Sequence, residues 1–288
     1  MAPPTENRRA NRSRGRAGGG ALLSALSCCL LFAVLHTRAE GASASGSSVG
    51  TTFSPGRALP TAGSPSTVDA AGRAAGPSEL AAAAPDLASE VLDLALATLA
   101  CSSDPAIADA PTLAIIDYSL PSTEPRLWLF DRERGDLLLH SLVAHGVGTG
   151  EKFATRFSND EGTRASSLGL FRGGEVYRGR NGLSLRLDGL EPGINDRARA
   201  RTIVLHGAWY VSPDFVREHG RLGRSWGCPA VEPKYSSFVI DHLKEGGALF
   251  VHGDDRSWLA KERNDRCIRD RMSAFAADFP PQSRTAAR

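Results

Sequence analysis

Residues 41–77 are the part of the sequence that most limits how this 288-residue chain can fold. Of these 37 residues, 30 are Gly, Ala, Ser, Thr or Pro. Such a segment buries too little apolar surface to offset the entropy that a chain loses when it becomes ordered. We therefore expect a flexible linker over residues 40–78, a single folded domain over residues 79–278 and a disordered tail over residues 279–288. The linker either lets the domain reach away from a membrane or acts only as a spacer.

The first 39 residues have the pattern of an export signal. Five arginines and one glutamate lie within residues 1–16, an apolar run with small Ser and Cys residues spans 21–35, and small residues follow at 39–44. This order is typical of a secretory signal peptide, and the apolar run is shorter than the about 20 residues of a membrane-spanning helix. We therefore predict a signal peptide over residues 1–39 and an exported protein of the periplasm or cell envelope. An uncleaved signal that anchors the chain is the alternative.

The basic residues of the chain are concentrated in that leader. The whole chain has a formal net charge of +2, but residues 1–39 hold six arginines and one acid, so the remainder has a net charge of −3. A protein that binds nucleic acid needs a basic patch or stripe on its folded part. Acidic residues are interspersed among the later arginines, so we predict a mixed, solvated surface and no nucleic-acid partner. We expect a monomer that meets a membrane only through an uncleaved signal.

The pattern of the folded part is mainly β, with helices near both ends. An apolar face predicts a helix over residues 78–100 with a start or a break near Pro85, and further helices are expected over residues 233–245 and 255–278. Between them, clusters of Gly, Pro, Asn and Asp separate short apolar runs, as in an all-β sandwich or barrel. We expect strands over residues 113–120, 126–131, 137–144, 168–171, 183–187, 202–206 and 248–252.

Three of the five cysteines lie beyond the leader: Cys101, Cys228 and Cys267. In an exported protein, an odd number of cysteines usually leaves one thiol free or paired with another chain. Cys101 closes the first predicted helix and Cys267 lies in the last one, so a disulfide between them would clamp the two ends of the domain. The alternative, that both are buried and reduced, stays open at this point.

Cys228 lies in a different context, the glycine-rich loop from Gly223 to Val231. A structural cysteine normally lies in an apolar periodic run, whereas this one lies in a turn near a guanidinium, which favours the reactive thiolate. Gly227 lets a substrate approach the backbone closely and can leave main-chain N–H groups free to bind an oxyanion. Cys228 is therefore the candidate nucleophile.

A thiol nucleophile needs a base, and His206 is the best placed histidine. It ends the apolar run 202–205, is followed by Gly207 and precedes Cys228 by 22 residues, which is enough to cross a loop and return. A strand holds such a side chain rigidly, and an imidazole that is neutral near pH 7 can take the proton of a thiol.

Two other motifs do not support a cofactor or metal site. The run Gly146–Lys152 is rich in glycine but lacks the spacing and the Lys-Ser/Thr ending of a phosphate-binding loop, so we predict a turn. His140 and His145 are five residues apart on an extended run, where alternation places them on opposite faces and disfavours joint zinc ligation. We predict no cofactor and no metal.

The segment 203–231 resembles the murein L,D-transpeptidase catalytic domain, the YkuD-like family. That family has a His-Gly-type strand end, a loop and then Ser/Thr-x-Gly-Cys. The matching letters are Leu-His206-Gly207-Ala-Trp-Tyr210 and then Gly-Arg224-Ser225-Trp-Gly227-Cys228-Pro. Further similar stretches begin at Ile116, Val143, Phe157, Ser166 and Gly182, so the likeness runs from about residue 112 to residue 253. It implies a β-sandwich-like fold and cysteine acyl transfer on peptidoglycan stem peptides.

The resemblance also implies a role for each matching residue. Cys228 would be the nucleophile, His206 the base, and the carbonyl of Gly207 the group that orients the imidazole. The N–H groups of Gly227 and Cys228 would form the oxyanion hole, and Ser225 would support the loop.

The sequence departs from the family pattern at two places. Many relatives have a histidine directly before Gly-Cys, where this chain has Trp226, so any second-histidine role would fall to His145. Many also have Arg or Asn shortly after the cysteine, where this chain has Pro229-Ala230, so Arg224 would instead bind the substrate carboxylate. Trp226 and Tyr210 complete the expected substrate-binding set.

These roles predict a transferase of cell-wall biogenesis. Cys228 would attack the carbonyl of the third residue of a stem tetrapeptide, release the terminal D-Ala and pass the acyl group to an amine of another stem, giving a 3→3 cross-link. Water in place of the amine would make the protein an L,D-carboxypeptidase or another cysteine peptidase that trims the wall. A non-catalytic wall-binding module is the third alternative, which the joint presence of His206 and Cys228 disfavours.

Overall fold

The computed structural model describes residues 74–278. The predicted signal peptide, the predicted linker up to residue 73 and the predicted tail at residues 279–288 lie outside this part of the chain. Within residues 74–278, no helix is both long enough and apolar enough to cross a membrane.

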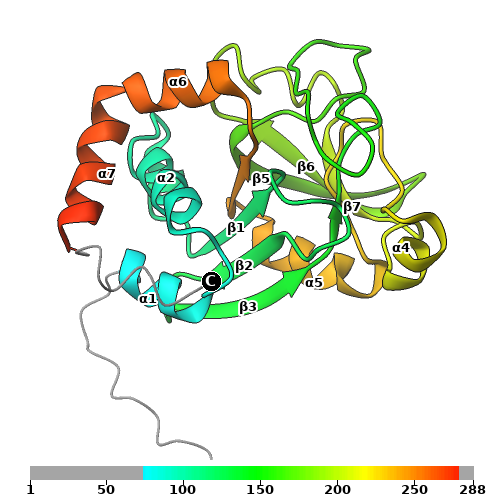
Figure 1. Cartoon of the computed structure of the whole chain (residues 1–288), viewed down its shortest axis with the longest axis horizontal. Coiled ribbons are helices and arrows are strands. Elements are labelled where there is room, and N and C mark those ends of the chain that lie inside the picture. The colour runs from blue at the N-terminus through cyan, green and yellow to red at the C-terminus, as the bar shows by residue number, and fades with distance from the viewer. Residues whose placement is uncertain (1–73, 279–288) are drawn as a thin grey trace, which may run out of the picture. The chain divides into compact units, whose positions relative to one another are not determined.

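One sheet of nine strands forms the centre of the described domain (Figure 1). The strand order is β3-β2-β1-β9-β5-β6-β7-β8-β4, with β1–β9 and β7–β8 parallel and the other pairs antiparallel. The predicted mainly β fold with flanking helices is confirmed, and all of its strands belong to this one hydrogen-bonded sheet. The strands are β1 (Thr112–Asp117), β2 (Leu127–Asp131), β3 (Asp136–Ser141), β4 (Val143–Ala144), β5 (Gly169–Gly179), β6 (Gly182–Gly189), β7 (Val204–Gly207), β8 (Ala230–Val231) and β9 (Ala248–His252).

The central strands are apolar at nearly every position because both faces of the sheet are covered there. All five residues of β9 are buried, as are the last five of β1. Strand β1 contacts both α2 (Ser89–Ala100) and α5 (Pro233–Leu243). A strand buried on both faces reads as a continuous apolar run, which is why the sequence signals these two strands clearly.

The first predicted helix is divided in two. Helix α1 (Pro77–Ala83) ends two residues before Pro85, with Ala84 between them, and α2 begins at Ser89. Proline has no N–H for a helical hydrogen bond and restricts the residue before it, and Ala84 has left the helical region with φ −131° and ψ 70°. The predicted break at Pro85 is confirmed.

The last predicted helix is also divided, and the prediction of one helix over residues 255–278 is wrong. Helix α6 (Arg256–Asn264) and α7 (Arg266–Asp278) meet at Asp265, whose backbone is extended. The carboxylate of Asp265 accepts a hydrogen bond from the N–H of Ile268 at 3.1 Å, so it caps the first turn of α7.

Three short elements were not expected from the sequence: α3 (Pro105–Ala108), α4 (Pro213–His219) and β8. Helix α4 has local start and stop signals. The hydroxyl of Ser212 accepts a hydrogen bond from the N–H of Phe215, and Gly220 ends the helix in the left-handed conformation with φ +68°.

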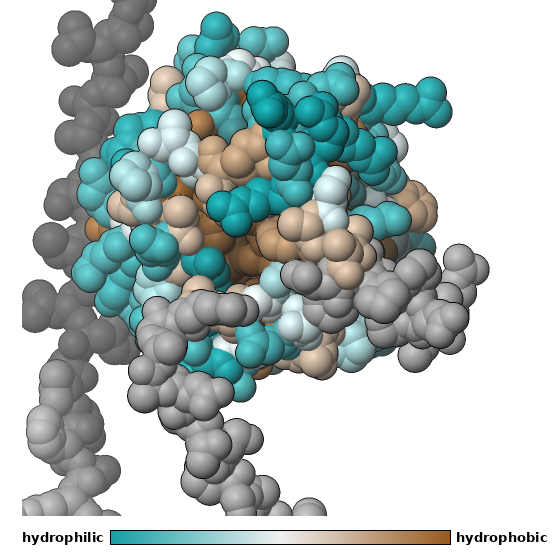
Figure 2. Space-filling model, turned by 90° about the vertical axis from the view of Figure 1, so that its left-hand side faces the viewer, coloured by the Kyte–Doolittle hydropathy of each residue, from teal (hydrophilic) through white to brown (hydrophobic). Residues whose placement is uncertain are grey.

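The helices from the two ends of the described chain lie together. Figure 1 shows α1, α2, α6 and α7 gathered at one end of the sheet, and α4 and α5 toward the other. On the face that carries the terminal helices, an apolar strip lies between hydrophilic borders (Figure 2). Met272 and Phe275 of α7 are partly buried and pack against the core.

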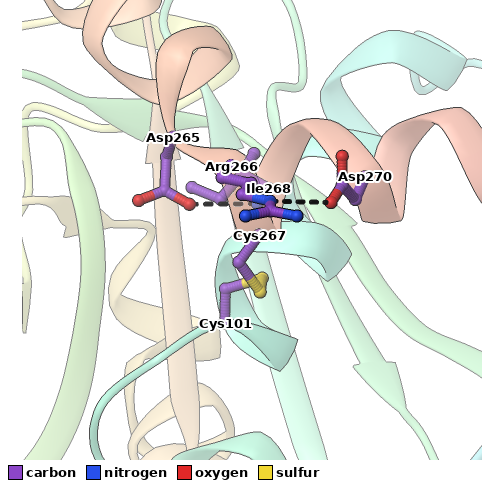
Figure 3. The surroundings of a disulfide bond; sticks show 6 residues. All are labelled: Cys101, Asp265, Arg266, Cys267, Ile268 and Asp270. Atoms are coloured by element: carbon purple, nitrogen blue, oxygen red, sulfur yellow. Dashed lines mark hydrogen bonds and ion pairs between the residues drawn. A yellow bond between two sulfur atoms is a disulfide. The ribbon is translucent and has the colours of Figure 1, made fainter.

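A disulfide joins Cys101, at the end of α2, to Cys267, in the first turn of α7 (Figure 3). The Cα atoms of the two cysteines lie 5.9 Å apart, and 166 residues separate them in the sequence. Of the two alternatives that the sequence left open, the structure has the bridged one. The bridge closes nearly the whole described domain into a covalent loop.

Candidate active site

The parallel pair of β7 and β8 brings the predicted base and nucleophile onto neighbouring segments. His206 lies opposite Ala230 in the strand register, two residues beyond Cys228. The N–H of Val204, in the same strand as His206, lies 3.5 Å from the sulfur of Cys228. The thiol is therefore held against the strand that carries the imidazole, although 22 residues separate the two in the sequence.

The imidazole of His206 has a fixed tautomer. The side chain is buried, and its Nδ1 lies 3.0 Å from the carbonyl oxygen of Gly207. A carbonyl only accepts hydrogen bonds, so Nδ1 carries the proton and Nε2 keeps a lone pair. Burial lowers the pKa of His206 below its usual value, while the hydrogen bond to Gly207 raises it in part. The imidazole is neutral at pH 7 and can accept a proton at Nε2.

The thiol of Cys228 is free and half-buried. Its sulfur lies 3.8 Å from the carbonyl oxygen of Thr202. Burial raises the pKa of the thiol, and the N–H of Val204, the charge of Arg201 and the N–H of Cys228 itself lower it only in part. The expectation that a nearby guanidinium favours the thiolate is therefore wrong in its net effect, because desolvation outweighs the favourable charge.

The guanidinium that acts on this thiol belongs to Arg201, which the sequence did not single out. Its nitrogens donate to the carbonyl oxygens of Ser158 and Ala165 and to the hydroxyl of Ser167, each at 2.6 Å. These partners are neutral, so the positive charge of Arg201 is not cancelled by a bonded carboxylate. The position of Arg201, just before the strand that carries His206, was the only available signal.

Hydrogen bonds from two serines hold the loop that carries Cys228. The hydroxyl of Ser225 donates to the carbonyl oxygen of Cys228 at 2.6 Å and accepts from the N–H of Gly227 at 3.1 Å. The hydroxyl of Ser166 donates to the carbonyl oxygen of Gly227 at 3.1 Å. Gly227 has φ +116°, and a Cβ atom there would lie 2.8 Å from the carbonyl oxygen of Ala165, so only glycine fits.

This bonding corrects the predicted oxyanion hole. The N–H of Gly227 is occupied by the hydroxyl of Ser225 and does not point freely at a substrate. The N–H of Cys228 lies close enough to its own thiol to lower the thiol pKa. Of the two predicted donors, Cys228 is the one that remains.

His145 is buried behind the loop rather than exposed to a substrate. Its Nδ1 lies 2.8 Å from a guanidinium nitrogen of Arg126, and its Nε2 lies 3.3 Å from the carbonyl oxygen of Gly150. Burial and then the charge of Arg126 lower the pKa of His145 to about 4, so the ring is neutral. The backbone of His145 also accepts a hydrogen bond from Ser225, so this residue supports the loop and does not form the predicted substrate contact.

The predicted carboxylate-binding residue, Arg224, already has an acidic partner. Its NH1 lies 2.7 Å from Glu151 and 3.0 Å from the carbonyl oxygen of Gly150. Arg221 contacts the same glutamate at 3.0 Å. A substrate carboxylate would have to displace Glu151 to take a bidentate hydrogen bond from Arg224.

Two predicted aromatic contacts lie around the thiol. Trp226, two residues before Cys228, is 70% exposed, and the guanidinium of Arg164 lies 4.3 Å from the centre of its ring system. Burial and, to a smaller extent, the nearby Cys228 raise the pKa of Tyr210 to about 12. The phenol of Tyr210 therefore lies within electrostatic range of the sulfur.

A buried tyrosine beneath the loop also escaped the sequence analysis. The hydroxyl of Tyr118 lies 3.2 Å from the carbonyl oxygen of Ala144, and burial raises its pKa. Tyr118 and Ser166 line a small cavity together with Gly227. Both residues belong to stretches that carry the family resemblance, so that resemblance was the available signal. Within residues 74–278, no three His, Cys, Asp or Glu side chains are grouped to hold a metal ion.

Comparison with known proteins places this chain in a family. The family profile described as "L,D-transpeptidase catalytic domain" matches residues 83–252, which is more than half of the chain. No curated protein sequence matches the chain.

Among solved structures, an L,D-transpeptidase from Mycobacterium smegmatis is 13% identical with a TM-score of 0.31, over 50% of this chain and 59% of the other. The helical cell shape determining protein Pgp2 from Campylobacter jejuni is 15% identical with a TM-score of 0.32, over 50% of this chain and 47% of the other. L,D-transpeptidase 1 from Mycobacterium tuberculosis is 13% identical with a TM-score of 0.28, over 49% and 62% of the two chains. The chain thus spans about half to three-fifths of the length of these proteins. On the strength of the profile match, the chain belongs to the L,D-transpeptidase catalytic domain family.

Proposed function

We propose that this protein is an exported L,D-transpeptidase that acts on peptidoglycan stem peptides through a cysteine acyl-enzyme. The observation that carries the proposal is the pairing of a free thiol with a buried, tautomer-fixed imidazole. Cys228 is the free cysteine of the described chain, and His206 lies on the strand whose backbone contacts its sulfur. Membership of the family supports the choice of stem peptides as substrates.

The first half-reaction forms a thioester. Nε2 of His206 takes the proton from the thiol as the sulfur attacks the carbonyl carbon of the third stem residue. The N–H of Cys228 stabilises the negative charge that develops on the carbonyl oxygen. The bond to the terminal D-Ala then breaks, and the imidazolium returns the proton to the leaving amine.

The second half-reaction uses the same groups in reverse. An amine of a second stem attacks the thioester, His206 removes its proton, and a new amide forms while the sulfur leaves and is reprotonated. The product is a 3→3 cross-link. Neither half-reaction needs a redox step, so the residues of the chain are sufficient for it.

Ser225, Ser166 and Tyr118 serve this chemistry by fixing the loop. The hydrogen bonds of Ser225 and Ser166 hold the backbone on both sides of the thiol, and Tyr118 lines the cavity beneath the loop, so that the sulfur keeps one orientation from cycle to cycle. Trp226 and Tyr210 supply the aromatic surface next to the thiol. We assign them to contacts with the stem peptide.

The test is incubation with purified disaccharide-tetrapeptide, with mass spectrometry of the products. A cross-linked dimer that has lost one D-Ala supports transfer, whereas a tripeptide alone supports the hydrolytic alternative, an L,D-carboxypeptidase. Cys228→Ala should abolish both products, and His206→Gln should form them far more slowly. His219→Gln, which changes an exposed histidine of α4, should leave them unchanged. Full activity of Cys228→Ala would contradict the mechanism, and binding without any product would favour the non-catalytic module.

A further inference from the structure

The arginine that lies on Trp226 has no role in the mechanism described so far. Arg164 is exposed, and its guanidinium carbon lies 4.3 Å from the centre of the Trp226 ring. Within residues 74–278, this guanidinium has neither a hydrogen-bond acceptor nor an ion-pair partner. An indole offers no lone-pair acceptor, so the N–H donors of Arg164 are available to a ligand.

The backbone of Arg164 is fixed beside the loop that carries Cys228. Its carbonyl oxygen accepts a hydrogen bond from the N–H of Gly148 at 2.9 Å. The carbonyl oxygen of the next residue, Ala165, would lie 2.8 Å from a Cβ atom at Gly227, the neighbour of the nucleophile. Both ends of the Arg164 side chain are therefore placed at the candidate active site, the root by this packing and the tip by the indole.

The conformation of Arg164 is one that a long side chain seldom adopts. Its φ is +54°, in the left-handed region, where side chains other than those of Gly, Asn and Asp are uncommon. No hydrogen bond or ion pair of this side chain offsets the strain in the part of the chain that the structure describes. Strained residues of this kind cluster at ligand-binding and active sites, and the position of Arg164 agrees with that.

The other guanidinium groups near the loop have partners within the protein. Arg224 is paired with Glu151, and Arg201 donates to neutral groups inside the domain. Arg156 lacks an acidic partner too, but its Nε donates to a backbone carbonyl oxygen at 3.0 Å. Arg164 is thus the guanidinium that combines free donors with a contact to the residue two positions before the thiol.

We propose that Arg164 binds the terminal carboxylate of the donor tetrapeptide, the role that the sequence assigned to Arg224. This inference rests on the proposed function and names the group that reads its substrate. One residue, D-Ala, separates the attacked carbonyl from the terminal carboxylate, so their carbon atoms lie within about 4 Å of each other. The two residues from Trp226 to Cys228 span at most about 7 Å, so a carboxylate near the thiol is within reach of Arg164. A guanidinium donates two parallel hydrogen bonds to a carboxylate.

The test compares disaccharide-tetrapeptide with the same compound carrying a C-terminal carboxamide. For the unaltered protein, kcat/KM should be at least about tenfold higher for the acid, because hydrogen bonds between charged groups are the strong ones. Arg164→Gln should remove this preference by lowering kcat/KM for the acid and leaving that for the carboxamide unchanged. Arg263→Gln, which changes an exposed arginine of α6, is the matched control and should keep the preference. An equal loss for both compounds in Arg164→Gln would show a structural role and overturn the proposal.

A binding measurement separates this inference from the proposed reaction. Calorimetry with the Cys228→Ala variant should show tighter binding of the acid than of the carboxamide, and adding Arg164→Gln should abolish the difference. This preference in a protein that forms no product would support the site and contradict the proposed function. Product formation without any preference would do the reverse.

Two further variants complete the test. Arg164→Lys keeps the charge but loses the paired donors, so it should give an intermediate preference, and it replaces Arg164→Gln if that variant does not fold. Arg156→Gln should keep the full preference. A preference that is lost in Arg156→Gln and kept in Arg164→Gln would place the carboxylate on the other arginine and overturn the assignment.

Discussion

At Cys228, burial and charge act on the thiol in opposite directions. Removal from water raises its pKa, and the positive charge of Arg201 together with two backbone N–H groups lowers it by less. Burial also lowers the pKa of His206. Both shifts favour the neutral thiol and the neutral imidazole over the ion pair. On this account the proton moves during the attack, and His206 acts as a general base rather than as one half of a preformed ion pair.

The reactivity of Cys228 toward iodoacetamide should therefore increase with pH through a midpoint above that of an ordinary cysteine, because only the thiolate is alkylated. Arg201→Met should move this midpoint to still higher pH, since it removes the charge that lowers the thiol pKa. Arg224→Met should leave it unchanged, because Arg224 is paired with Glu151. The measurement is the alkylation rate between pH 6 and pH 10, and a midpoint below that of free cysteine contradicts the assignment.

Ser225 should matter more for activity than for stability. Ser225→Ala removes the hydroxyl that joins the N–H of Gly227 to the carbonyl of Cys228, at a cost of about 1–3 kcal/mol in the free energy of unfolding. We expect kcat/KM for the tetrapeptide to fall at least tenfold, because the nucleophile loses its fixed orientation. Ser237→Ala, on the exposed face of α5, is the control. Unchanged kcat/KM in Ser225→Ala would show that the loop does not need this support.

Local sequence singles out the candidate nucleophile and the candidate base but not their surroundings. Cys228 lies in a glycine-rich turn and His206 ends an apolar run, and both are signals within a few residues. The role of Arg201 depends on contacts with residues 158–167, more than 30 positions away. The N–H of Gly227 donates to the hydroxyl of Ser225 and is therefore unavailable to an oxyanion. This hydrogen bond depends on a turn geometry that the sequence Ser-Trp-Gly-Cys does not specify.

At the scale of elements, a buried pair joins the two parallel central strands. Asp117 at the end of β1 lies opposite His252 at the end of β9, with Oδ1 and Nδ1 2.8 Å apart. Burial raises the pKa of Asp117, but the hydrogen bond and charge of His252 and the hydrogen bonds from Ser119 outweigh it, so the net pKa is lowered. A lowered carboxyl pKa stabilises the fold above the unfolded pKa of about 3.9, and this contribution is lost as pH falls through the folded pKa.

Asp117→Asn should accordingly reduce the free energy of unfolding by about 2 kcal/mol at pH 7. The difference between this variant and the unaltered protein should shrink as the pH falls below about 3.9, because the unfolded chain then binds a proton that the folded carboxylate, with its lowered pKa, does not yet bind. Asp254→Asn, which changes an exposed neighbour, should have little effect at either pH. Urea unfolding at pH 7 and pH 3 measures this, and a difference that grows on acidification runs against the expectation.

Elements that are long or buried on both faces could be predicted from the sequence, and short elements could not. The apolar runs of β1 and β9 are unambiguous, and Pro85 marks the gap between α1 and α2. Strand β8 has only two residues and exists because β4 and β7 lie on either side of it, which no local pattern specifies. The division between α6 and α7 was missed because Asp265 is the only signal there, without a glycine or proline.

At the scale of the whole molecule, the disulfide between Cys101 and Cys267 ties the first helices of the described domain to the last. A bridge across 166 residues restricts the unfolded chain strongly, and the chain-entropy relation gives about 5 kcal/mol of stabilisation. The double variant Cys101→Ser/Cys267→Ser should lose about this much free energy of unfolding in urea. Cys228→Ser, which removes the free thiol, is the matched control and should lose far less. Equal stability of the double variant and the unaltered protein would mean that the bridge does not hold the domain together.

The central claim, that Cys228 forms an acyl-enzyme with a stem peptide, is tested most directly by intact-protein mass spectrometry after an acid quench. Incubation with disaccharide-tetrapeptide should add the mass of the substrate less one D-Ala, and peptide mapping should place this addition on Cys228. Cys228→Ala should show no addition, and His206→Gln should form it far more slowly. An addition of the same mass in Cys228→Ala, or on a different residue, would contradict the account.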